Sequence, residues 1–199
     1  MGTRYNTYKM YTPIQIIPKI QSLELENVGC WKSLRLEFVP GVNIITEEDG
    51  GLGKSTILSS IMSQVRPRND MGLVAPRLVP GKSRITVELM SSGGTFLAGS
   101  RGEIPPHTGV ESHGQYIMRL LTSSLAMAEP DCAVIFDDEV FGALDDPHRS
   151  RAAELLNESS VQVICVIPHR LNPADFPDAR IYACSWDRDK EAARMRQLQ

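Results

Sequence analysis

The sequence has no apolar run close to the roughly 18 residues that a membrane-spanning helix needs. It contains four cysteines, none in the Cys-x-x-Cys spacing of metal or redox sites. No heptad repeat is long enough for a coiled coil. The net charge is −3, so the chain as a whole has no electrostatic attraction to nucleic acid. These absences exclude a membrane protein, a disulfide-stapled domain and a long coiled coil.

A length of 199 residues fits one domain, and we expect an N-terminal arm over residues 1–19 followed by a single domain over residues 20–199. The arm contains Tyr5, Tyr8 and Tyr11 and lacks the apolar core of a signal peptide. It is either docked on the domain or frayed. The scattered cysteines are typical of reduced core residues, which favours a cytoplasmic protein.

A glycine-rich turn lies between a predicted buried strand at residues 42–46 and a predicted helix at residues 55–62. The N–H groups of such a turn and of the helix N-terminus bind phosphate. In the pattern G-x-x-x-x-G-K-[ST], the lysine reaches the β- and γ-phosphates of ATP and the hydroxyl binds Mg²⁺. The predicted phosphate-loop residues are Gly50, Gly51, Gly53, Lys54, Ser55 and Thr56.

The first glycine position of this pattern holds an acid, Glu48, with Glu47 and Asp49 beside it. Carboxylates at this place repel phosphate unless they point away or lie near the metal. The alternative interpretation is a Gly-Lys-Ser turn that opens an ordinary helix.

A second carboxylate site follows the apolar residues 133–136, which predict a parallel strand. Asp138 comes after its carboxyl end, where open α/β sheets bind ligands, and would bind Mg²⁺. Glu139 would orient or deprotonate a water molecule as general base. Asp137 and Asp138 are a second possible pair, although the ATPase motif that residues 138–145 resemble, which ends in Leu144 and Asp145, favours Asp138 with Glu139. The alternative is a strand that ends in a solvated acidic turn.

Two further segments are weak signals when each is taken alone. Ser112 precedes His113, Gly114, Gln115 and an apolar helix, and serine is a preferred N-cap whose helix end offers a second anion site. Residues 161–167 predict another buried strand, and His169 follows it. A lone histidine after a strand is usually structural.

In this order, the four segments resemble the motifs of ABC-type ATPases of the non-transporter RecF- and SMC-like group. Residues 138–145 (DEVFGALD) resemble a joined Walker B motif and D-loop, and the resemblance extends from about residue 22 to residue 186. It implies an α/β P-loop head with a mostly parallel central sheet, flanking helices and a small antiparallel β lobe. It also implies ATP and Mg²⁺ as cofactors. The resemblance implies that Ser112 and Gly114 contact the nucleotide held by the opposite subunit. It also implies that Gln115 and Asp145 bind nucleotide and that His169 senses the γ-phosphate.

The small lobe is predicted by residues 23–28 and 34–39, which alternate apolar and charged side chains like two antiparallel strands. The turn between them resembles the aromatic-Lys-Ser turn of SMC-like heads. Trp31 would either stack on adenine or cap the core, and Lys32 would contact phosphate. A last strand at residues 179–184 and a polar terminal helix at residues 187–199 complete the prediction.

The sequence departs from the family pattern between Lys54 and Ser112. This segment holds no glutamine after Val65, so the Q-loop glutamine is not visible. It is also short for a helical lobe and predicts two strands, at residues 84–89 and 95–98, which suggests a reduced head. These departures concern the hydrolysis rate and the coupling to partners more than nucleotide binding.

The function that the resemblance implies is an ATP-binding and hydrolysing head of DNA repair, chromosome handling or phage defence. It would dimerise around nucleotide with itself or with a different protein. The alternative is a nucleotide-gated regulatory module with little or no turnover, whereas a transporter subunit is disfavoured because the lobe that docks the membrane partner is missing. The basic segment at residues 66–84 is either a solvated loop or a contact to DNA or a partner.

Overall fold

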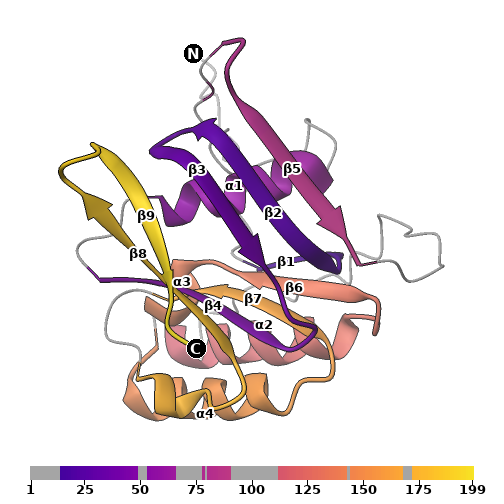
Figure 1. Cartoon of the computed structure of the whole chain (residues 1–199). Helices are drawn as coiled ribbons and strands as arrows, with labels where there is room; N and C mark the ends of the chain where they lie inside the picture. The colour runs from indigo at the N-terminus through magenta and orange to yellow at the C-terminus, as the bar shows by residue number, and fades with distance from the viewer. Residues whose placement is uncertain are drawn as a thin grey trace, which may run out of the picture.

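The computed structural model describes residues 14–48, 53–65, 78, 80–90, 112–142, 144–167 and 172–199, without the side chains of Gln15, Asp138 and Glu139. In this part of the chain the strands form one six-stranded and one three-stranded sheet (Figure 1).

The six-stranded central sheet is parallel in its middle and antiparallel at both edges. Adjacent strands pair in parallel from β6 to β7, from β7 to β4 and from β4 to β8. The edge strands β1 and β9 pair antiparallel with β6 and β8. This arrangement confirms the predicted mostly parallel sheet. In spatial order the strands are β1 (Ile14–Pro18), β6 (Cys132–Phe136), β7 (Gln162–Val166), β4 (Val42–Glu47), β8 (Arg180–Asp187) and β9 (Ala192–Gln197).

The three-stranded sheet is the predicted antiparallel lobe and consists of β3 (Trp31–Glu37), β2 (Ile20–Val28) and β5 (Arg84–Leu89) in that order. The fully buried Gln162 of β7 ties it to the central sheet. Its amide nitrogen donates to the carbonyl oxygens of Ile20 and Val39, both at 2.9 Å, and its amide oxygen accepts from the Ile20 N–H at 2.8 Å. The second strand predicted between β5 and Ser112, at residues 95–98, lies outside the described residues.

The helices cover the central sheet on both faces, as the sequence predicts. Helix α1 and the three-stranded sheet lie on one face, and α2 and α4 lie on the other (Figure 1). A short helix, α3, follows β6 directly, and a 3₁₀ turn (Pro173–Asp175) precedes β8. The α-helices are α1 (Lys54–Val65), α2 (His113–Met127), α3 (Asp138–Gly142) and α4 (Asp146–Asn157).

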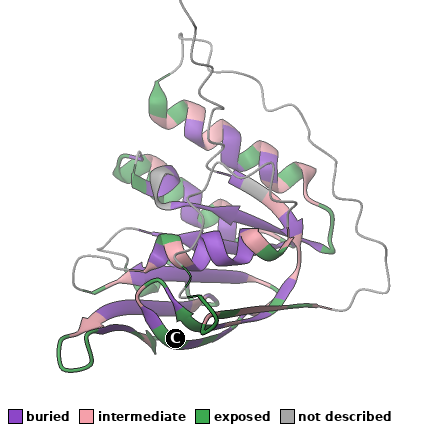
Figure 2. Ribbon diagram, turned by 90° about the horizontal axis from the view of Figure 1, so that it is seen from above, coloured by how far each residue is buried: buried purple, intermediate pink, exposed green. Residues whose placement is uncertain are grey.

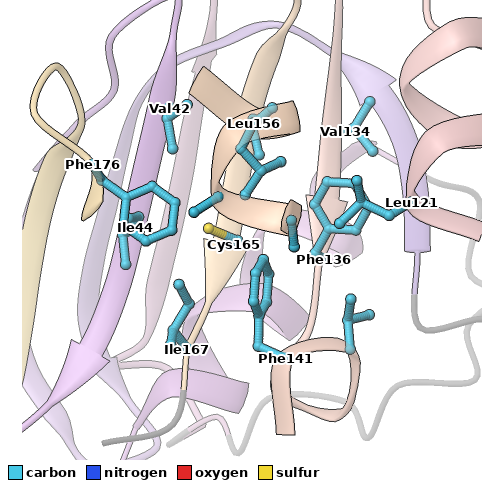
Figure 3. Packing of buried hydrophobic residues seen from close by; sticks show 14 of the residues in the cluster. Val42, Ile44, Leu121, Val134, Phe136, Phe141, Leu156, Cys165, Ile167 and Phe176 are labelled. Carbon is cyan, nitrogen blue, oxygen red and sulfur yellow. The ribbon is translucent and has the colours of Figure 1, made fainter. Parts of the chain in front are cut away.

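The parallel strands are buried on both faces, so successive side chains enter two different clusters. Ile44 of β4 packs with residues of α2 and α4, and its neighbour Ile45 packs with residues of α1 and β2. Both side chains are fully buried, and the burial of each contributes about 1.5–3 kcal/mol to the folding free energy. Figure 2 shows the inner strands in the colour of buried residues, and Figure 3 shows the first cluster, in which Phe136 and Cys165 lie near Leu121 and Leu156.

The described segments at both ends of the chain form edge strands of the central sheet. The terminal helix predicted over residues 187–199 is wrong, because β8 continues to Asp187 and β9 follows it as an edge strand. The burial of Ala192 and Ala193 against the sheet decides this outcome over the helix propensity of the segment. At the other end, β1 lies within the segment that the sequence assigned to an arm, and it pairs with β6. Tyr5, Tyr8 and Tyr11 lie outside the described residues.

All four cysteines are unpaired, and three of them are buried. Burial raises the pKa of Cys165 and of Cys132, which fits the interpretation of these thiols as core residues. Among the described residues, no helix combines the length and the apolar composition that crossing a membrane requires. No group of three or more His, Cys, Asp or Glu residues suited to a metal ion occurs in the same part of the chain.

Candidate functional site

The carboxyl ends of the parallel strands lie at one edge of the central sheet. Strand β4 ends there at Glu47, between β7 and β8, and β6 ends at Phe136 on the far side of β7. Ligands of open α/β sheets bind outside this edge. The segments predicted to bind phosphate and metal follow β4 and β6 directly, so the topology brings both to the same edge.

Helix α1 begins at this edge with its N-terminus at the phosphate loop. The Gly53 carbonyl oxygen accepts a hydrogen bond from the Ile57 N–H at 3.1 Å, which starts the helical ladder. The N–H groups of the first turn have no partner within the helix and are suited to an anion. Ser55 is exposed in this turn, and Thr56 is half-buried. Gly50 and Gly51 lie outside the described residues.

Trp31 packs against Gly53, the last glycine of the phosphate loop. It is 1% exposed, and its indole N–H donates to the Gly53 carbonyl oxygen at 3.2 Å. Gly53 has φ of +108°, and a Cβ atom on it would lie 2.7 Å from Cζ2 of the indole ring. Of the two interpretations of Trp31, the structure favours the core residue, because the ring is enclosed between the loop and the small sheet.

Lys54 forms an ion pair with Glu47, the last residue of β4. The exposed fractions of the two side chains are only 8% and 9%. Cys184 of β8 lies within electrostatic reach of both: burial raises the pKa of its thiol to about 11, Lys54 acts to lower it and Glu47 acts to raise it. The lysine predicted to hold phosphate is therefore paired with a carboxylate at the base of its own loop.

Glu48, which occupies the first glycine position of the phosphate-loop pattern, forms an ion pair with Arg196 of β9. Its backbone N–H donates to the Cys184 carbonyl oxygen at 3.0 Å. The nearby Lys32 is exposed and donates to the Lys190 carbonyl oxygen in the turn between β8 and β9. Glu48 therefore points at the β8–β9 hairpin, and the acid that pairs with the lysine is Glu47.

The end of β6 carries the predicted metal and water carboxylates. Asp137 is buried, with 5% exposure, and its carbonyl oxygen accepts from the Val140 N–H at 3.3 Å. Asp138 and Glu139 are the first two residues of α3, so their backbone lies at the sheet edge; their side chains are outside the described part. The predicted sensor His169 lies beyond the last described residue of its segment, Ile167, which follows β7.

The predicted signature segment caps α2. The Ser112 hydroxyl oxygen accepts from the Gln115 N–H at 3.3 Å, and the Gln115 side-chain oxygen accepts from the Ser112 N–H at 2.9 Å. This reciprocal capping box fixes the first turn of the helix. Ser112 and Gln115 are exposed, so the helix N-terminus faces solvent.

Asp145 caps α4 beside the N-terminus of α2. Its carboxylate accepts from the His148 N–H at 3.0 Å and lies 2.6 Å from Nδ1 of the His148 ring. The backbone hydrogen bond from His148 is the main cause that lowers the pKa of Asp145. A Cβ atom on Gly114 would lie 3.3 Å from the same Nδ1 atom. The histidine thus joins the two predicted motifs at one surface, although no sequence motif pointed to it.

Gly53→Ala tests the support that Trp31 gives to the phosphate loop. We expect a loss of folding stability above the roughly 1–3 kcal/mol that a strained backbone residue costs, because the new Cβ atom also collides with the indole ring. Gly81→Ala is the matched control, since Gly81 has φ of +70° and a Cβ atom on it would meet no other atom within 4 Å. Urea denaturation of both variants measures the difference. Equal losses would contradict a rigid contact between Trp31 and the loop.

No protein-family model matches the sequence, and no curated protein matches it. Solved structures do match. An SMC head domain from Thermotoga maritima has a TM-score of 0.58 and 16% identity, with 91% of this chain and 99% of that chain covered. The SMC head bound to the C-winged helix domain of ScpA has a TM-score of 0.60 and 14% identity, with 92% and 98% covered. The chain shares the fold of SMC head domains. Since nearly all of both solved chains is matched, these comparisons give no support to a reduced head.

Proposed function

We propose that this chain is an ATP-binding and hydrolysing head of the RecF- and SMC-like type, which dimerises around nucleotide. The observation that carries the proposal is that β4, β6 and β7 end at the same edge of one parallel sheet, so the three predicted segments that follow them begin there. The capped N-terminus of α2 lies against the first turn of α4, where a Cβ atom on Gly114 would be 3.3 Å from the His148 ring. The fold shared with SMC head domains supports the same function.

The described residues fit a phosphate group at the start of α1. Gly53 has a backbone conformation that side chains disfavour and lies against Trp31, so the loop can approach an anion closely with its N–H groups. In the proposed site Lys54 binds phosphate, Ser55 and Asp138 hold Mg²⁺, and Lys32 lies at the margin. Glu139 takes the proton of the attacking water, and His169 holds that water near the γ-phosphate. The bound metal would supply the charge that offsets the phosphates.

The dimer surface that we propose consists of the N-termini of α2 and α4. Ser112 and the Asp145 side chain, which is 65% exposed, lie there on the chain's own surface. They are suited to contact nucleotide held by a second subunit, with Gly114 and Gln115 shaping the turn. The second subunit is a further copy of this chain or a different head. The proposal also includes a contact of residues 66–84 with DNA. It further includes a cytoplasmic location.

A melting experiment with Mg-ATP tests nucleotide binding. At a concentration of a hundred times Kd, Mg-ATP is expected to stabilise the protein by roughly 2.7 kcal/mol. AMP should give much less, because it lacks the β- and γ-phosphates that Lys54 would contact. A melting curve that saturating Mg-ATP leaves unchanged would contradict the proposal.

Two observations favour the second candidate, a nucleotide-gated module that hardly turns ATP over. Lys54 is held in a buried pair with Glu47, and the segment between Val65 and His113 offers no glutamine for the metal. A phosphate-release assay separates the two functions. Turnover that is lost in Glu139→Gln supports the ATPase, whereas nucleotide binding without any turnover in the wild type supports the gated module.

A further inference from the structure

The buried ion pair between Glu47 and Lys54 joins the two ends of the phosphate loop. Glu47 is the last residue of β4 and Lys54 is the first residue of α1, so the pair links the end of the strand to the start of the helix. Both side chains are more than nine-tenths enclosed. Solvent and salt screen a charge pair in such surroundings less than they screen an exposed pair.

We propose that Glu47 is a positioning residue that competes with the nucleotide phosphates for Lys54. This inference rests on the proposed function. In the nucleotide-free chain the carboxylate neutralises the buried ammonium group of Lys54. When a triphosphate binds, the ammonium group either moves to the phosphate oxygens or donates to them and to Glu47 at the same time. Part of the binding free energy is then spent on this exchange, and the apparent affinity for ATP is lower.

The neighbouring acid does not have this role. Glu48 pairs with Arg196, and the side chains of that pair are 30% and 68% exposed, so solvent screens it. Its partner lies on β9, whereas the partner of Glu47 is the first residue of α1. The electrostatic influence of both Glu47 and Lys54 on Cys184 is a second sign that their charges act inside the fold. The competition therefore belongs to one carboxylate and not to the acidic segment as a whole.

The test is the Kd of Mg-ATP, measured by calorimetry on the full chain and on Glu47→Gln. We expect Glu47→Gln to bind at least about tenfold more tightly, because a unit charge at contact distance in a partly buried site changes binding by more than an order of magnitude. Inorganic tripolyphosphate should show the same gain, and AMP should show none. Glu24→Gln is the matched control for net charge: its carboxylate pairs with Arg35 on the small sheet, and we expect a change below about twofold.

Glu47→Asp keeps the test decisive if Glu47→Gln does not fold. The aspartate side chain is one methylene shorter, so its carboxylate lies further from Lys54 and competes less with the phosphates. The affinity for Mg-ATP should therefore exceed that of the wild type. Binding by the folded variants that is equal to or weaker than wild type would overturn the inference, because Glu47 would then assist the site. A gain shared equally by AMP would also overturn it. If wild type, both variants and the control all fail to bind Mg-ATP, the proposed function fails instead.

Discussion

Glu139→Gln is expected to bind Mg-ATP like the wild type and to lose turnover by a factor of about 10²–10⁴, the usual contribution of a general base. Glutamine keeps the size of the side chain but cannot take a proton from water. Single-turnover phosphate release measures the effect. A variant with wild-type turnover would assign the base to another group, and Asp137, the buried acid at the end of β6, would be the next candidate.

The same variant should accumulate an ATP-bound dimer, because the step that separates the two subunits is blocked. Ser112→Arg in this background should abolish the dimer by placing bulk at the N-terminus of α2, with the ATP affinity of the monomer unchanged. Thr122→Arg is the control, since it adds the same bulk at an exposed position further along the helix. Light scattering with Mg-ATP distinguishes the two. A Glu139→Gln protein that binds ATP and stays monomeric would rule out the homodimer and leave a heteromeric partner or a simple binding module.

Lys54→Ala is expected to have two large effects. In the absence of nucleotide it should lower the free energy of unfolding by about 3–5 kcal/mol, because it breaks a buried ion pair by removing one of the two charges. It should also abolish the stabilisation by Mg-ATP, since the cation that would contact the phosphates is gone. Denaturant titration measures the first effect, and melting with Mg-ATP measures the second.

The double variant Glu47→Gln/Lys54→Met separates these two effects. It removes both charges, so most of the lost stability should return, whereas the response to Mg-ATP should stay absent. A single Lys54→Ala variant as stable as the wild type would contradict the buried ion pair. A double variant that still responds to Mg-ATP would remove Lys54 from the proposed site.

The parts of the fold that the sequence predicted best are those whose strands are buried on both faces. Residues 133–136 are a continuous apolar run, and residues 42–46 contain three β-branched apolar residues, Val42, Ile44 and Ile45; the two segments form β6 and β4. The alternation of residues 23–28 and 34–39 likewise predicted the pairing of β2 with β3. Strand β9 could not be found in this way, because its partner is β8 and its residues favour a helix when they are considered alone.

The sequence predicts the order of the candidate site's segments along the chain, whereas the local contacts of these segments depend on tertiary packing. The choice between Glu47 and Glu48 is an example. Side chains of a strand alternate between faces, so Glu47 shares the face of Ile45, which packs with α1, and Glu48 takes the other. This alternation predicts which glutamate faces Lys54 only when the face of the sheet that α1 covers is known. The contact of His148 with Gly114 joins two helices and leaves no local signal in the sequence.

The central claim is that ATP binds at the start of α1, and a crystal structure with Mg²⁺ and a non-hydrolysable ATP analogue tests it most directly. We predict the triphosphate against the N–H groups that follow Gly53, with the Lys54 ammonium group on its β- and γ-phosphates. We also predict Ser112 of a second subunit at the γ-phosphate. Two results from crystals grown with saturating nucleotide would contradict this claim. In one, the nucleotide is bound elsewhere on the protein; in the other, no nucleotide is bound at α1 and Lys54 still pairs with Glu47.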